Sequence, residues 1–256
     1  IGVKLKNLYS KKRSQIRGDH RCCAQGQTMD KKHRSKQQIG VLGGTFDPVH
    51  QGHLGLARET LEKFSLDRIL FMPAFRSPHK PSTPPASPAH RLEMLRLALQ
   101  NDPALEISTI EIQRETLSYT IDTINSVKLQ FPECELSLIL GRDNLTDLDS
   151  WKDSRKIMEC CHVLVGSRPG VEASSAEKAV LGLFGGDSPY IPGEPENGAL
   201  EFCHCTTGRH LVIHQITPRD ISSSIIRDQI AGGKPVGNLL PPGVEIYIMD
   251  NHLYQA

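Results

Sequence analysis

Hydrophobic positions from residue 39 onward fall into short runs separated by helical periodicities. Six apolar, β-rich runs predict strands at 39–42, 68–72, 105–112, 135–140, 162–165 and 210–216. Apolar residues three and four positions apart predict helices near 53–64, 88–100, 119–130, 151–159, 174–183, 222–231 and 242–249. This alternation predicts an α/β fold in a single domain, residues 39–256, built on a Rossmann-like, doubly wound parallel sheet with helices on both faces.

Three stretches add to this outline. Residues 73–88 contain six prolines and no periodicity, which predicts a long surface loop serving as a substrate lid or a mobile connection. Residues 185–208 are rich in glycine and proline and are expected to form a surface insertion. The last predicted helix, 242–249, is expected to close the chain by packing on the sheet, and Tyr254 after it is assigned no chemistry.

The first 38 residues differ from the rest in charge. They hold 11 Lys and Arg against two Asp, so residues 39–256 carry a net charge of −8 within a total of +1. Since this arm has no periodicity and one aromatic residue, it is predicted to be a disordered extension. A nucleic-acid contact through its positive charge is the alternative. Met29 lies ten residues before the first strand, and we expect translation to begin there.

Composition favours a globular protein outside the membrane. Hydrophobic residues make up 38% and charged residues 23% of the chain. No apolar stretch reaches the roughly 20 residues that span a bilayer, and no secretory signal is recognisable, so a cytoplasmic location is expected. Seven cysteines, an odd number, indicate free thiols. Cys203 and Cys205 with two nearby histidines do not have the spacing of a zinc site, so no metal-binding residues are predicted.

The densest chemical signal is the glycine-rich segment 43–53, which lies between the first strand and the first helix. His50 and His53 are one helical turn apart at the predicted helix start, so both rings can reach one ligand. Free N–H groups and the helix dipole favour an anion there. Gly43, Gly44 and Gly52 lack the Cβ atoms that would hold a ligand away from the backbone. This pattern predicts a phosphate site.

The segment GGTFDPVHQGH resembles the [TS]-x-x-H-x-G-H signature of the nucleotidyltransferase superfamily, in the version typical of bacterial nicotinate-nucleotide adenylyltransferases. Five further motifs of that family follow in order. They are 77–80 (SPHK, where P-P-H-K is usual), 118–123 (SYTIDT), 141–143 (GRD) with Trp151 after it, 167–170 (SRPG) and 221–227 (ISSSIIR, with Ser224 where Thr is usual). The resemblance covers residues 39 to about 253, without the stretch 185–208.

This resemblance implies an enzyme of NAD biosynthesis that transfers AMP from ATP to nicotinate mononucleotide, giving nicotinate adenine dinucleotide and pyrophosphate. It implies His50, His53 and Arg227 as catalytic residues. It implies ATP and phosphate contacts from Gly43, Gly44, Thr45, Phe46, Gly52, Lys80, Ser222 and Ser223. For the mononucleotide it implies Thr120, Gly141, Asp143, Trp151 and Arg168. Mg²⁺ is expected to arrive bound to the triphosphate, because no carboxylate cluster suggests a dedicated cage.

Several alternatives stay open at this level. Trp151 could stack on the pyridine ring or could instead dock its helix on the core. Lys80 could reach the phosphates or only keep its loop soluble. The acceptor could be the amide mononucleotide or phosphopantetheine, used by other enzymes of the superfamily. A nucleic-acid-binding protein using the basic arm is the alternative from another class. A homo-oligomer is compatible with the sequence.

Overall fold

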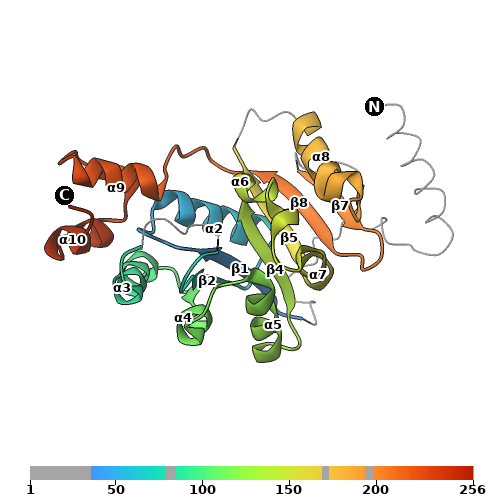
Figure 1. Ribbon diagram of the computed structural model, residues 1–256, viewed down its shortest axis with the longest axis horizontal. Coiled ribbons are helices and arrows are strands. Elements are labelled where there is room, and N and C mark those ends of the chain that lie inside the picture. The colour runs from blue at the N-terminus through green and yellow to red at the C-terminus, as the bar shows by residue number, and fades with distance from the viewer. Residues whose placement is uncertain (1–35, 79–84, 169–172, 194–198, 256) are drawn as a thin grey trace.

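The computed structural model describes residues 36–78, 85–168, 173–193 and 199–255, and its core is one eight-stranded sheet (Figure 1). The strand order is β3-β2-β1-β4-β5-β8-β7-β6. The strands are β1 (Gln38–Gly44), β2 (Arg68–Pro73), β3 (Leu105–Ile107), β4 (Glu135–Gly141), β5 (His162–Ser167), β6 (Tyr190–Pro192), β7 (Leu200–His204) and β8 (His210–Gln215). All neighbours from β3 to β8 are parallel, whereas β7 pairs antiparallel with β8 and with β6. The predicted doubly wound fold is confirmed.

Alternating side chains of the strands feed two separate cores, one on each face of the sheet. On one face, Val41 and Leu138 belong to a core completed by α5 (Thr120–Gln130), α7 (Ser154–Cys160) and α8 (Ala173–Gly182). On the other, Leu42 and Ile139 pack with α2 (Gln51–Lys63), α3 (Pro88–Leu99), α9 (Ser223–Ala231) and α10 (Pro242–Asp250). Figure 1 shows α2 and α5 on opposite sides of the sheet. Both strand faces are buried, which explains the nearly continuous apolar runs in the sequence.

Two expectations about the strands were wrong. The run 105–112 does not continue as a strand, because β3 ends at Ile107 and α4 (Ile110–Arg114) follows. Among the described strands, β3 pairs with β2 alone, and the helix lets Ile110 pack against the core. The stretch 185–208 is not wholly irregular either. It contributes β6 and β7, which extend the sheet beyond β8 and bury Tyr190 and Phe202 in its core.

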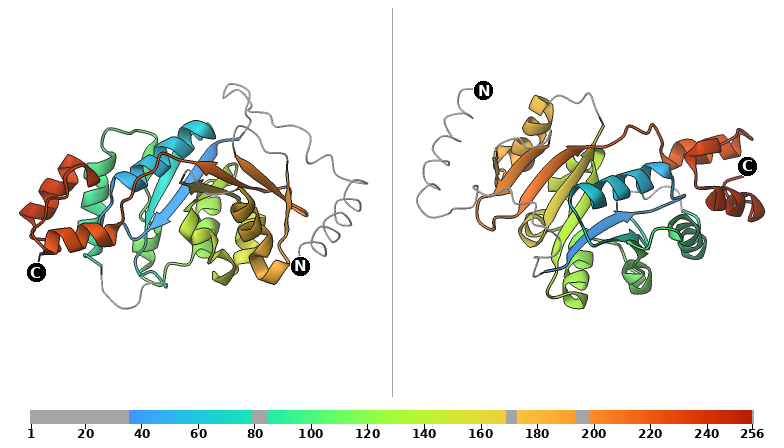
Figure 2. Two further views of the ribbon diagram at one scale, coloured as in Figure 1. Left: turned by 90° about the horizontal axis from the view of Figure 1, so that it is seen from above. Right: turned by 180° about the vertical axis from the view of Figure 1, so that it is seen from behind.

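The final helix also lies elsewhere than expected. α10 packs against α3 rather than on the sheet, and the Tyr247 hydroxyl lies 2.9 Å from His90 Nδ1 across that contact. Figure 2 shows α9 and α10 together at one end of the molecule beside α3. The C-terminal turn after α10 is thereby carried back toward the end of β1. No helix in the described part of the chain is long and apolar enough to cross a membrane.

The order in which successive strands are added to the sheet reverses between β1 and β4. β2 and β3 extend the sheet on one side of β1, and β4 and β5 extend it on the other. In open α/β sheets the crevice beyond the carboxyl ends of such strands is the usual ligand site. β1 ends at Gly44 and β4 ends at Gly141, so two predicted site segments begin at the carboxyl ends of these neighbouring parallel strands.

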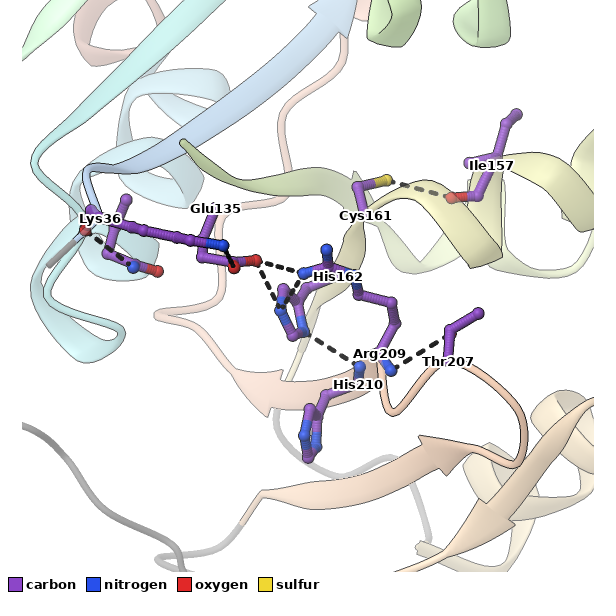
Figure 3. Close-up of polar contacts among 9 residues, drawn as sticks. Lys36, Glu135, Ile157, Cys161, His162, Thr207, Arg209 and His210 are labelled. Carbon is purple, nitrogen blue, oxygen red and sulfur yellow. Dashed lines mark hydrogen bonds and ion pairs between the residues drawn. The ribbon is translucent and has the colours of Figure 1, made fainter. Parts of the chain in front are cut away.

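An ion-pair cluster lies at the opposite ends of the strands, where β4, β5 and β8 begin. Glu135, His162 and His210 are the first residues of β4, β5 and β8. Glu135 accepts hydrogen bonds from Lys36 Nζ at 3.1 Å and from Arg209 Nη1, and its Oε2 lies 3.8 Å from His162 Nε2 (Figure 3). The His162 and His210 rings stack at 5.5 Å. This cluster ties neighbouring strand starts together at the edge away from the glycine-rich turn.

Candidate active site

The glycine-rich turn delivers both motif histidines to the start of α2. His50 is the N-cap, with extended backbone, and His53 is the third residue of the helix. The His50 N–H donates to His53 Nδ1 at 3.3 Å, and the two rings stack with centroids 3.7 Å apart. Because Nδ1 of His53 is an acceptor, a neutral His53 carries its proton on Nε2. The tautomer that results offers a donor to a ligand.

His50 is held in a buried position, with 6% of its surface exposed. Burial lowers its pKa from 6.5 to about 4, so the imidazole is neutral near pH 7. A neutral ring interacts with phosphate as a hydrogen-bond donor rather than as a cation. Any positive charge at the site therefore comes from other residues.

Phe46 supports the histidines from inside the protein. Its ring is 1% exposed and meets the His53 ring edge-on, with centroids 5.0 Å apart. A Cβ on Gly44 would lie 3.1 Å from the Phe46 ring, and a Cβ on Gly52 would lie 3.0 Å from the His50 ring. The side chain of Phe46 is therefore enclosed by the protein, and the role of this residue in phosphate binding stays a prediction. No described atom lies within 4 Å of a Cβ built on Gly43, so space is open there.

The start of α9 docks on the same turn. Ser222 caps this helix by accepting the Ile225 N–H at 3.2 Å. Ser223 Oγ donates to the Pro48 carbonyl at 3.0 Å, and Arg227 Nη1 donates to the Asp47 carbonyl at 2.8 Å. The two helix starts thus meet, and Arg227 comes to the turn that carries both histidines. The three residues predicted as catalytic therefore lie beyond the carboxyl end of β1.

The loop between β8 and α9 is fastened along α2. Glu59 on α2 accepts the Thr217 N–H at 2.6 Å and a hydrogen bond from Arg219 Nη1 at 3.0 Å. Gly55 makes room for this contact, since a Cβ there would lie 2.0 Å from Arg219 Nη1. These contacts set the position of α9 relative to α2, and hence of Ser222 relative to the histidines.

A second group of predicted residues lies around the start of α5. Thr120 is its first residue, and Tyr119 before it provides no side-chain cap among the described residues, so N–H groups at this end can serve a ligand. Trp151 is partly buried against the core next to this region. Lys152 Nζ lies 4.5 Å from the Tyr119 ring centroid and 3.1 Å from Asp122 Oδ2. The segments around Thr120 and Trp151, distant in sequence, are therefore neighbours.

The remaining predicted residues divide between the described and undescribed parts of the chain. Asp143 lies in α6 (Arg142–Leu145), directly after Gly141 at the end of β4. Arg168 follows β5 and pairs with the exposed Asp220, Nη1 to Oδ1 at 3.0 Å. Lys80 lies outside the described residues. The individual functional roles of these residues stay predictions.

Three residues close to the site have no role in the sequence interpretation. Asp47 is 7% exposed, and its Oδ1 accepts the Ala86 N–H at 3.0 Å and the Tyr254 hydroxyl at 2.6 Å. Arg91 is fully buried and donates to the carbonyls of Thr45 and Ala86. The burial of Arg91 could have been predicted from the sequence, because Arg91 lies on the same helical face as Leu95 and Ala98. No such pattern exists for Tyr254, which follows the last helix.

A cytidylyltransferase-like family model matches residues 41–229. The chain is 38% identical to the "Probable nicotinate-nucleotide adenylyltransferase" of Citrifermentans bemidjiense, over 85% of this chain and 98% of that protein. It is 34% identical to the protein of the same name from Moorella thermoacetica, over 85% of this chain and 92% of that protein. The solved Plasmodium falciparum nicotinic acid mononucleotide adenylyltransferase complexed with NaAD shares the fold, with a TM-score of 0.61, 17% identity and coverage of 85% and 97%. The chain therefore belongs to the cytidylyltransferase-like family and, within it, to the nicotinate-nucleotide adenylyltransferases.

Proposed function

We propose that this protein transfers the adenylyl group of ATP to nicotinate mononucleotide, forming nicotinate adenine dinucleotide and pyrophosphate. The observation that carries this proposal is the meeting of the α2 and α9 starts, where Arg227 Nη1 donates to the Asp47 carbonyl three residues before His50. Two helix N-termini and a guanidinium directed at one place suit a polyphosphate. The names of the curated relatives support the choice of nucleotide acceptor.

In this proposal the phosphate of the mononucleotide attacks the α-phosphorus of ATP directly. The new P–O bond forms as the bond to the bridging oxygen between the α and β phosphates breaks, and that electron pair leaves with pyrophosphate. His53 donates its Nε2–H to an oxygen on which charge develops, and the neutral His50 supports it. Arg227 supplies positive charge to the leaving group. The chain contributes alignment and electrostatic stabilisation rather than a nucleophile.

The second group of residues is proposed to hold the acceptor. Helix N–H groups at Thr120 suit the nicotinate carboxylate, and Trp151 suits the pyridinium ring. Asp143, in α6 after β4, would accept ribose hydroxyls, and Arg168 and Lys80 would serve phosphates. Trp151 is partly buried against the core, so stacking on the pyridine ring and packing on the core are compatible in this one position.

Mg²⁺ would enter this site as a companion of the triphosphate, whose negative charge it would offset. No group of three or more His, Cys, Asp or Glu side chains in the described ranges could hold a metal ion. The carboxylate nearest the histidines in sequence, Asp47, has Oδ1 occupied by two hydrogen bonds. The described residues therefore offer a poor cage, and we assign no protein ligand to the ion.

Pyrophosphate release tests the proposal directly. Purified protein with MgATP is assayed with nicotinate mononucleotide, nicotinamide mononucleotide and phosphopantetheine in parallel. The expected result is the highest kcat/KM with the acid mononucleotide. A preference for the amide or for phosphopantetheine would replace the acceptor but keep the chemistry. Absence of turnover with every acceptor would overturn the proposed activity.

A further inference from the structure

Asp47 connects four separate parts of the chain at the candidate site. It belongs to the glycine-rich turn, and its Oδ1 accepts the N–H of Ala86, two residues before α3. The same oxygen accepts the hydroxyl of Tyr254 at 2.6 Å, from the C-terminal turn. On its other side, the Asp47 carbonyl accepts Arg227 Nη1 at 2.8 Å, and Oδ2 lies 3.8 Å from the same nitrogen.

The Tyr254 contact requires a specific backbone arrangement. His252 and Tyr254 have φ values of 51° and 63°, in the left-handed region that residues other than glycine rarely adopt. Leu253, between them, donates its N–H to the Ile248 carbonyl at 3.0 Å and packs on the core. A chain end held in this conformation needs favourable contacts to keep it, and the hydroxyl bond to Asp47 is one of them.

The surroundings make this hydrogen bond strong. Asp47 is 7% exposed, and the fully buried Arg91 contributes positive charge nearby. Burial and the contact with Asp47 raise the pKa of Tyr254, so the hydroxyl keeps its proton and acts as the donor. Asp47 therefore has one oxygen fixed by neutral donors, which leaves the other facing Arg227.

We propose that Tyr254 is a positioning residue for adenylyl transfer, acting through Asp47 on Arg227. Its hydroxyl holds the Asp47 carboxylate in the orientation in which Oδ2 and the backbone carbonyl together locate the Arg227 guanidinium beside the histidine turn. The C-terminal turn is thereby part of the active-site support rather than a passive end. This inference rests on the proposed function of Arg227.

The test compares Tyr254→Phe with Tyr247→Phe. Each removes one hydroxyl from the C-terminal region, but the Tyr247 hydroxyl faces His90 on α3. With MgATP and nicotinate mononucleotide, Tyr254→Phe is expected to lower kcat roughly tenfold, the effect of losing one hydrogen bond to a charged group. Tyr247→Phe is expected to leave kcat unchanged. Thermal melting of both variants shows whether a loss of folding is responsible.

A double-mutant cycle separates positioning from general support. If Tyr254 acts through Arg227, Tyr254→Phe lowers kcat little further in an Arg227→Ala background. An equal fold-loss in both backgrounds, or an unchanged kcat for Tyr254→Phe alone, would overturn the inference. If wild-type protein shows no turnover, the proposed function fails instead. Calorimetric affinity for MgATP then decides about Tyr254, since weaker binding by Tyr254→Phe than by Tyr247→Phe supports positioning and equal binding rejects it.

Discussion

His50 and His53 stack with their ring centroids 3.7 Å apart and an interplanar angle of 25°. Two imidazoles this close repel one another if both are charged, and the burial of His50 keeps its ring neutral near pH 7. The backbone N–H of His50 in turn selects the tautomer of His53 by donating to its Nδ1. The turn and the helix start therefore place a neutral His50 ring beside a His53 ring that this backbone N–H orients.

Replacing His53 by Ala is expected to lower kcat about 10²–10³-fold, the typical cost of one donor that stabilises developing charge. The fold should persist, because His53 lies at the solvent side of the helix start and is partly exposed. Steady-state pyrophosphate release measures the effect. His252→Asn is the control, since Asn tolerates the positive φ of that exposed residue. A His53→Ala enzyme with wild-type kcat would remove the histidine from the mechanism.

Gly52→Ala is expected to lower kcat, whereas Gly43→Ala is expected to raise KM for ATP. The new Cβ at residue 52 would lie 3.0 Å from the His50 ring, so the ring must shift, and kcat should fall by up to about 10²-fold. At residue 43 the Cβ meets no described atom within 4 Å, so melting should be unchanged while KM for ATP rises. Kinetics with both variants and their melting curves check this. An unchanged KM for Gly43→Ala would show that no phosphate approaches this backbone.

Stability should fall as the pH drops from 6.5 toward 4. His214 on β8 is 1% exposed, its Nε2 lies 3.2 Å from Thr60 Oγ1, and burial lowers its pKa to about 4. Because the unfolded chain takes up this proton near pH 6.5, the stability of the neutral form is present above that pH and is lost below it. The loss is at most about 3 kcal/mol for this residue. Urea unfolding at several pH values should give a shallower decline for His214→Gln, and parallel curves would contradict the assignment.

Glu135→Gln should reduce stability without affecting turnover. Glu135 accepts hydrogen bonds from Lys36 and Arg209 at the start of β4. His162 first, and then Arg209 and Lys36, hold the pKa of Glu135 below its usual range. Removing its charge weakens both bonds and should cost about 1.5 kcal/mol. The cluster lies at the amino ends of the strands, opposite the candidate site, so kcat should remain that of the wild type. Urea unfolding of Glu135→Gln measures its stability, and steady-state kinetics measure its kcat. A changed kcat would show that the cluster is coupled to the candidate site at the other ends of the strands.

Deleting residues 1–28 is expected to leave turnover unchanged. The family match covers residues 41–229 and does not include this arm. If the basic arm served a nucleic acid, the full chain would bind it with strong salt dependence and the shortened chain would not. Kinetics and a salt titration of DNA and RNA binding compare the two proteins.

Local sequence patterns determined the elements that carry the site. The apolar run ending in Gly43-Gly44 and the spacing of His50 and His53 predict the strand, turn and helix start that the structure contains. Such features depend on neighbours a few residues away, so periodicity and glycine placement report them. The Ser222 cap of α9 was predictable for the same reason.

Contacts between distant segments depended on the tertiary structure. Residues 110–114 form a helix whose Ile110 packs against the core, and residues 190–192 and 200–204 join the sheet because β8 offers them an edge. Tyr254 and Asp47 are 207 positions apart, and α10 brings them together only by packing on α3. No pattern along the chain encodes which surfaces meet across such a separation, because packing of the whole core selects them.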